Sequence, residues 1–148
     1  MKGRFPFVVV RVVLGFIFVC AAVGKIADPA AFACDVDNYR LLPYLAVTLT
    51  AAVLPWLELL CGVSLIIGRW TRGSALLVAV MLVAFLAGLI SALARGLDID
   101  CGCFTLGSEA SKVSLHRVLE DVVMLAAALW IWRREESAAL ARASGKSA

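Results

Sequence analysis

Residues 73–93 read GSALLVAVMLVAFLAGLISAL, a run of twenty-one residues without a charged side chain. A helix of roughly 20 mostly apolar residues is long enough to cross the hydrocarbon core of a bilayer. The run therefore predicts a membrane-spanning helix. The whole chain agrees with this interpretation, because 63% of its 148 residues are hydrophobic and 17% are charged, against about 45–50% and about 25% in soluble domains.

This composition excludes several classes of protein. A soluble fold could not cover so much apolar side chain with so little polar surface. Intrinsic disorder requires low hydrophobicity and is excluded for the same reason. The net charge is only +3 and no basic run is interleaved with aromatic residues, so no nucleic-acid partner is expected. The lipid bilayer is the first partner that the sequence predicts.

Apolar segments on both sides of this run extend the pattern to four spans, at about 5–26, 44–67, 73–93 and 113–132. A cleaved signal peptide is the alternative for the first segment. Arg11 interrupts that segment, which is also long for a signal, so we expect a true span. The predicted fold class is all-α: a single integral membrane four-helix bundle over residues 1–132, followed by a polar cytoplasmic tail at 133–148. Small residues predict close helix contacts at Gly15, at Gly62 and along the Ala84/Gly88 pair.

The distribution of Lys and Arg predicts the orientation, because short cytoplasmic loops are enriched in these residues. With four spans, both termini and the connection between the second and third spans share one side. Nine of the fourteen basic residues lie on that side: Lys2, Arg4, Arg11, Arg69, Arg72, Arg133, Arg134, Arg142 and Lys146. The other five are Lys25, Arg40, Arg95, Lys112 and Arg117. We therefore expect a multi-pass protein of a bacterial inner membrane, with both termini cytoplasmic and the connections 27–43 and 94–112 periplasmic.

The five cysteines divide between the spans and the periplasmic connections. Cys20 and Cys61 fall within predicted spans, where cysteine is usually an inert packing residue. Cys34, Cys101 and Cys103 fall on the oxidising side, where disulfides persist. The Cys101-Gly102-Cys103 spacing allows a small, strained disulfide ring, and strained exposed disulfides exchange readily. These three cysteines are the candidate catalytic residues for thiol–disulfide exchange, with Cys34 as a third, resolving thiol.

Other interpretations of these cysteines remain open. Cys34 could form a static disulfide with Cys101 or Cys103, or the thiols could have no role. Three thiolates together with Asp100 or His116 could instead bind copper(I) or zinc. The sequence does not decide among these alternatives, although thiol exchange is favoured.

Charged residues inside the spans form a second candidate site. A charged group in hydrocarbon is costly and usually faces the bundle interior or water. Arg11 and Lys25 lie on one face of the first span, Glu58 lies in the second, and Asp121 lies in the fourth. We expect an intramembrane polar network in which Arg11 could pair with Glu58 and Asp121 could join them. Such a network either fixes the helix register or forms a proton- or quinone-linked site.

Several motifs together resemble those of the MauE-like and DoxX-like membrane proteins, over residues 8–132. They are Arg11-x-x-Leu14-Gly15-x-x-Phe18, Gly24-Lys25, Asp28-Pro29-x-x-Phe32, the stretch 38–43, Leu54-Pro55-Trp56-Leu57-Glu58-Leu59-x-x-Gly62, the stretch 100–104 and Glu120-Asp121. The resemblance implies a four-span protein tied to methylamine utilisation. It also implies a periplasmic thioredoxin-like partner (MauD-like) and a disulfide-containing client such as methylamine dehydrogenase. Thr105 departs from the family pattern, which has glycine after the Cys-Phe pair.

Taken together, these observations predict an inner-membrane thiol–disulfide handling protein with an outward-facing Cys-Gly-Cys. A quinone is one candidate electron acceptor, but the sequence has no quinone motif. Two alternatives belong to other classes. One is a metal-binding or metallochaperone membrane protein, and the other is a non-catalytic assembly partner of DoxX type.

Overall fold

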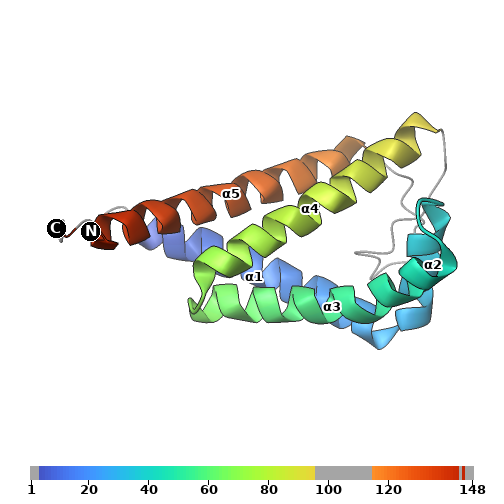
Figure 1. The fold of residues 1–148 in the computed structure, drawn as a ribbon, viewed down its shortest axis with the longest axis horizontal. Helices are drawn as coiled ribbons and strands as arrows, with labels where there is room; N and C mark the ends of the chain where they lie inside the picture. The colour runs from blue at the N-terminus through green and yellow to red at the C-terminus, as the bar shows by residue number, and fades with distance from the viewer. Residues whose placement is uncertain (1–3, 96–114, 144, 146–148) are drawn as a thin grey trace.

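The computed structural model describes residues 4–95, 115–143 and 145, and all regular structure within these ranges is helical. The helices in chain order are α1 (Arg4–Ala27), α2 (Pro29–Asn38), α3 (Tyr44–Ile67), α4 (Thr71–Ala94) and α5 (Leu115–Ala143). The four long helices run alternately up and down the length of the molecule, and the short α2 lies at one end (Figure 1). The prediction of an all-α fold is confirmed.

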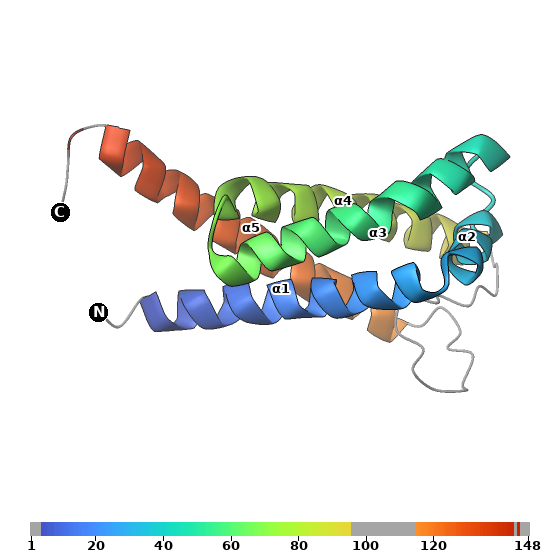
Figure 2. The ribbon, with the colours of Figure 1, turned by 90° about the horizontal axis from the view of Figure 1, so that it is seen from below.

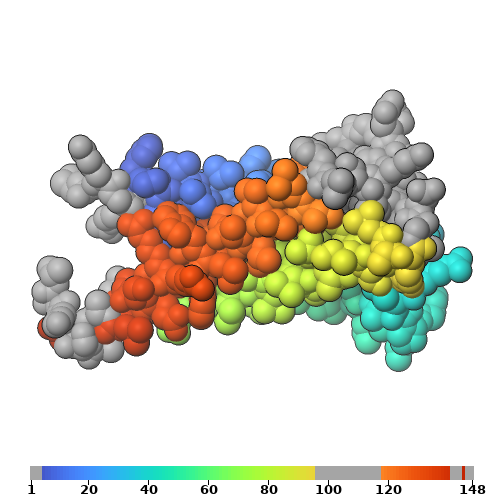
Figure 3. Space-filling view, turned by 90° about the horizontal axis from the view of Figure 1, so that it is seen from above, coloured from blue at the N-terminus to red at the C-terminus, as the bar shows by residue number. Residues whose placement is uncertain are grey.

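The core lies where the four long helices meet. Helix α1 packs on α3 and α4 packs on α5, while contacts of α3 with α4 and of α1 with α5 join the two pairs. On the face seen in Figure 3, α5 lies between α1 and α4. Fully or nearly fully buried apolar side chains come from each of these helices: Leu14, Phe18, Leu65, Val78, Leu82, Ala128 and Ile131.

Two glycines bring the backbones of α1 and α3 together. A Cβ added to Gly15 would lie 2.7 Å from the carbonyl oxygen of Gly62, and one added to Gly62 would lie 2.8 Å from that of Gly15. No side chain larger than hydrogen fits at either position without moving a helix. The close contact predicted at these two residues is confirmed. Gly88 differs, because its nearest neighbours are Tyr39 and Leu41 rather than another long helix.

Within the described residues, three helices are long and apolar enough to cross a membrane: Phe5–Ala27, Tyr44–Ile67 and Thr71–Ala94. Many large apolar side chains on their outer faces are exposed, among them Val12, Leu49, Leu60, Val80 and Val83. Lipid rather than water suits such surfaces. Helix α5 is not among the three, because charged residues flank a shorter apolar stretch at 122–132. The fourth predicted span therefore remains a prediction.

The connection expected at 27–43 contains the short helix α2. Asp28 caps this helix by accepting a hydrogen bond of 2.9 Å from the backbone N–H of Ala31, and Pro29 occupies its first turn. Both residues are favoured at these positions, since the cap satisfies an unpaired donor and proline lacks the N–H that would have no partner. Ten residues of the connection expected at 27–43 are therefore helical.

The start of α1 and the end of α5 lie at one end of the molecule (Figures 1 and 2). Helix α2, the end of α4 and the start of α5 lie at the opposite end. Helix α5 continues to Ala143, so residues 133–143 of the predicted tail are helical. An exposed ion pair holds this extension to α4, since the Arg72 guanidinium lies 3.0 Å from the Glu136 carboxylate.

Candidate functional site

The central polar feature is a buried ion pair between α1 and α3. The ammonium of Lys25, in the last turn of α1, lies 2.6 and 2.8 Å from the two carboxylate oxygens of Glu58 on α3. Only 8% of Lys25 and 7% of Glu58 is exposed. Charges taken out of water are tolerated when they are paired and hydrogen-bonded in this way. The pair therefore joins α1 and α3 at a buried position, where either charge would be costly without its partner.

The partner of Glu58 differs from the expected one. Arg11 lies toward the other end of α1, where its guanidinium is in contact with Gly68, the residue that ends α3. Gly68 has a φ of +82° and its N–H donates to the Ser64 carbonyl, so it closes the helix in a left-handed conformation. A cation near a helix C-terminus is favourably placed because the last carbonyls are partly negative. The expectation that Arg11 pairs with Glu58 was wrong, because Lys25 occupies both carboxylate oxygens.

The face of α1 that carries Arg11 and Lys25 is largely buried. Gly15 is buried, Phe18 and Ala22 are 6% and 0% exposed, and Lys25 completes the stripe, whereas Arg11 at its other end is half-buried. Asp121, the fourth member of the predicted network, is also buried on α5, at 7% exposure. The structure thus buries Lys25, Glu58 and Asp121, and it joins the first two directly.

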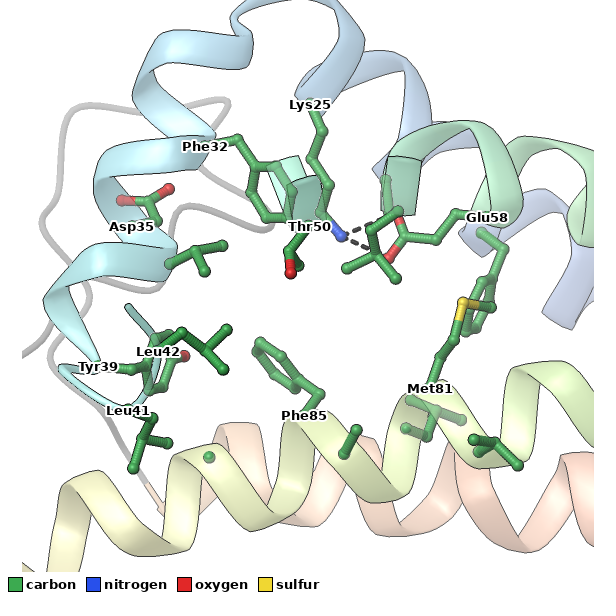
Figure 4. Close-up of a pocket in the computed structure, with 18 of the residues that line it drawn as sticks. Lys25, Phe32, Asp35, Tyr39, Leu41, Leu42, Thr50, Glu58, Met81 and Phe85 are labelled. Atoms are coloured by element: carbon green, nitrogen blue, oxygen red, sulfur yellow. Dashed lines mark hydrogen bonds and ion pairs between the residues drawn. The ribbon is translucent and has the colours of Figure 1, made fainter. Parts of the chain in front are cut away.

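Beside the ion pair lies a cavity of about 470 Å³. Most of its wall is apolar, and it is built by α1, α2, α3 and α4 with Met124 of α5. Figure 4 shows Lys25, Glu58 and Phe32 of α2 at one side of the cavity, Tyr39 near Leu41 and Leu42 at another, and Phe85 of α4 between them on the side of α4. A cavity of this size with a few polar groups in an apolar wall is typical of small-molecule sites.

Helix α2, which packs on α3 and α1, closes one side of this cavity, and Tyr39 directly after it contacts α4. The Phe32 ring lies 5.0 Å from the Lys25 ammonium, a cation–π distance. The rings of Tyr39 and Phe85 meet edge to face with centroids 6.3 Å apart. The guanidinium of Arg95, at the end of α4, donates to the Tyr39 carbonyl. These contacts fix α2 across the ends of the long helices.

The cysteines occupy different environments. Cys34 is exposed on α2, and within the described residues it forms no disulfide. Cys61 is buried in the core, as expected for a packing residue, whereas Cys20 is exposed on the outside of α1, so its expected burial was wrong. Cys101 and Cys103 lie outside the described residues, as does Asp100. Of the three cysteines predicted to exchange disulfides, Cys34 is the one that lies within the described residues.

The metal alternative cannot be placed on the described part of the chain. Within it, no three His, Cys, Asp or Glu side chains come together to hold an ion. The expected ligands for copper or zinc are the thiolates of Cys34, Cys101 and Cys103 with Asp100 or His116. Cys34 is described on α2, whereas Cys101, Cys103 and Asp100 lie outside the described ranges and only the backbone of His116 is described.

Sequence reasoning missed the cavity and the helix that covers it. The pair Asp28-Pro29 is a recognisable helix start and could have revealed α2. The convergence of Phe32, Tyr39 and Phe85 carried no such signal, because Phe32 lies on α2, Tyr39 directly follows that helix, and Phe85 lies on α4 with the whole of α3 in between. The packing of α2 on α3 and α1, together with the contact of Tyr39 with Phe85, brings these rings to one place.

A set of apolar helices with lipid-facing side chains, a buried Lys–Glu pair and an internal cavity defines a helical membrane protein. Comparison with known proteins gives the family: residues 4–134 match the family described as Methylamine utilisation protein MauE, so the chain belongs to the MauE family. The resemblance inferred from its motifs is confirmed.

Individual relatives support the assignment. The chain is similar to the methylamine utilization protein MauE of Paracoccus denitrificans, at 38% identity over 122 residues that cover 82% of this chain and 65% of that protein. It is 29% identical over 119 residues to that of Methylophilus methylotrophus, with 80% and 63% covered. It is 36% identical over 120 residues to that of Paracoccus versutus, with 80% and 64% covered. The chain thus spans less than two thirds of the length of these relatives. No solved structure matches the chain.

Proposed function

We propose that this chain is a four-span inner-membrane protein that exchanges disulfides on the periplasmic side, through Cys101 and Cys103 with Cys34 as a third thiol. The observation that carries the proposal is the position of Cys34, which is exposed on α2. Helix α2 lies at the end where α4 ends and α5 begins (Figure 1), and the Cys-Gly-Cys segment connects those two helices in the chain.

The exchange is written as two substitutions at sulfur. A thiolate of Cys101 or Cys103 attacks a client disulfide, forms a mixed disulfide and releases the client's other sulfur as a thiolate. The second cysteine thiolate then attacks the mixed disulfide, which leaves a Cys101–Cys103 disulfide and a client dithiol. Two electrons pass from the chain to the client, and the released thiolates take up the two protons that the cysteine thiols lost. The reverse sequence oxidises the client.

The proposed topology places this chemistry in an oxidising compartment. The start of α1 and the end of α5 share one end of the molecule (Figures 1 and 2), as an even number of spans requires. That end carries Arg72, Arg133 and Arg134, whereas Asp28, Asp35 and Asp37 lie at the α2 end. Basic residues favour the cytoplasmic side. Both termini are therefore cytoplasmic in this proposal, and α2 is periplasmic.

The partner and client follow from the family. The relatives are named for methylamine utilisation, which supports a role for this chain in that process. A periplasmic thioredoxin-like protein of MauD type would exchange electrons with the Cys-Gly-Cys, and a disulfide-rich client such as methylamine dehydrogenase would receive the correct disulfides.

Differential maleimide labelling in intact cells tests the proposal. A membrane-impermeant maleimide added before and after reduction should show Cys101 and Cys103 accessible from the periplasm, with an oxidation state that changes when the cell's disulfide machinery is perturbed. The matched control is Cys61→Ser, which removes a buried thiol and should leave the pattern unchanged. An oxidation state that never changes, or labelling only from the cytoplasm, would contradict the proposal.

A further inference from the structure

From the cavity beside the ion pair, we infer a binding site for a neutral lipophilic molecule that carries a carbonyl group. This site is distinct from the thiols and does not rest on the proposed disulfide exchange. It follows from three properties of the cavity: its apolar wall, a polar side whose cation, Lys25, is paired with Glu58 and which also carries the Asp35 carboxylate, and hydrogen-bond donors that face it.

The apolar wall sets the body of the ligand. Side chains such as Ile17, Leu54, Val80 and Met81 line the cavity, and the helices around it are those with lipid-facing outer surfaces. A ligand that enters from the bilayer would exchange one apolar surrounding for another. The volume of about 470 Å³ lies within the roughly 300–1,000 Å³ usual for small-molecule sites.

The ion pair sets the charge of the ligand. The charges of Lys25 and Glu58 cancel at 2.6 Å, so an anionic head such as a phosphate or carboxylate would meet no unbalanced cation there. Burying such an anion without compensation is costly. A neutral head avoids this cost.

The donors set the head group of the ligand. An ammonium has three N–H donors, and two hydrogen bonds of Lys25 go to Glu58. Among the residues that the structure describes, the ammonium's other neighbour is the Phe32 ring at 5.0 Å, so its third donor remains for a ligand. Thr50 also lines the cavity, and its hydroxyl makes no hydrogen bond with the lining residues drawn in Figure 4. A carbonyl oxygen is the neutral acceptor that fits both groups.

Two kinds of lipophile have this chemistry. One is a quinone, whose planar ring could lie against Phe32 and Phe85, and the other is a neutral lipid ester such as a diacylglycerol.

The experiment therefore uses decylubiquinone and dioctanoylglycerol as carbonyl probes, with decylbenzene as a probe that has an apolar body and no carbonyl. Native mass spectrometry of the purified full-length chain reports the number of bound molecules and the dissociation constant.

We expect one carbonyl probe to bind per chain, with an affinity about tenfold or more above that of decylbenzene. Decylbenzene has no carbonyl oxygen and so cannot accept a hydrogen bond from the charged Lys25 donor. Binding of either carbonyl probe supports the inference and identifies its source. Equal binding of all three probes, or no binding of either carbonyl probe to folded protein, would overturn it.

Matched variants locate the site. Gly88→Leu places a side chain in the cavity that Gly88 lines, whereas Gly73→Leu makes the same change on the same helix where nothing lies within 4 Å. The Gly88 variant should abolish binding and the Gly73 variant should preserve it.

Other variants test the hydrogen-bond donors. Thr50→Val and the double variant Lys25→Met/Glu58→Met should each weaken binding of the carbonyl probe and leave binding of decylbenzene unchanged. Cys101→Ser/Cys103→Ser should bind as the wild type does, which separates this site from the thiol chemistry.

Discussion

The Lys25 ammonium contacts both carboxylate oxygens of Glu58, at 2.6 and 2.8 Å, and both side chains are buried between α1 and α3. The contact joins residues 33 positions apart in the chain. It lies at the edge of the cavity beneath α2, so it links the packing of two long helices to the shape of the candidate site.

Removing one member of this pair should destabilise the protein strongly. Lys25→Met leaves the Glu58 carboxylate buried without its cation, and we expect the free energy of unfolding to fall by about 3–5 kcal/mol. The double variant Lys25→Met/Glu58→Met should recover most of this loss, because no lone charge remains. Unfolding in mixed micelles with increasing dodecyl sulfate measures the difference.

The exposed pair Arg72–Glu136 is the control for that prediction. Its side chains are 52% and 32% exposed, and pairs of this kind contribute about 0–1 kcal/mol. Arg72→Met should therefore change the free energy of unfolding little. Equal effects of Lys25→Met and Arg72→Met would show that the buried pair has no special role in stability.

The contact of Gly15 with Gly62 predicts a second effect on stability. Gly15→Ala places a Cβ 2.7 Å from the Gly62 carbonyl oxygen, so α1 and α3 must move apart, at a cost of about 1–3 kcal/mol. Gly24→Ala changes the same helix where nothing lies within 4 Å. It should be neutral or slightly stabilising, since alanine is the better helix former. A Gly15→Ala protein as stable as Gly24→Ala would contradict the observed packing.

The turn between α3 and α4 predicts a third effect on the stability of the protein. Gly68 has a φ of +82°, and a Cβ there would also meet the Arg11 guanidinium. Gly68→Ala should lower the free energy of unfolding by at least about 1–2 kcal/mol, the cost of a left-handed conformation for an L-residue. Gly73→Ala, on the following helix, should have no comparable effect. Thermal unfolding monitored by circular dichroism compares the two, and equal melting temperatures would show that the turn tolerates a side chain.

The orientation in the membrane can be tested with single cysteines. In a variant whose other cysteines are serine, Cys34 should react with an impermeant maleimide in intact cells because it is exposed on α2. A cysteine introduced by Ser137→Cys, at the other end of the molecule on α5, should react only after permeabilisation. The reverse pattern would invert the proposed topology, and labelling of both from outside would exclude an even number of spans.

The sequence predicted the features that depend on local pattern. Long apolar runs located α1, α3 and α4 closely, and the small residues Gly15 and Gly62 indicated where two helices approach. The stripe that ends at Lys25 was predicted to be interior and is largely buried. These properties follow from composition and from the helical period, which a single segment already contains.

The sequence did not predict the features that depend on packing between segments. Residue counting allowed Arg11 to pair with Glu58, and Arg11 and Lys25 lie on the same face of α1, so the helical period does not choose between them. The position of α1 along α3 decides the pairing, and it brings Lys25 to the carboxylate. The cavity was missed for a similar reason, since Tyr39 follows α2 and Phe85 lies on α4, and these two rings meet only in the folded chain.

The central claim is that the Cys-Gly-Cys pair exchanges disulfides, and transfer from the purified full-length chain tests it most directly. The oxidised chain is mixed with reduced bacterial thioredoxin, thiols are trapped by alkylation, and mass spectrometry counts the modified cysteines. The wild type should gain alkylation at Cys101 and Cys103 while thioredoxin is oxidised in equal amount, and Cys101→Ser/Cys103→Ser should transfer nothing. A folded wild-type chain that oxidises no more thioredoxin than this double variant would contradict the account.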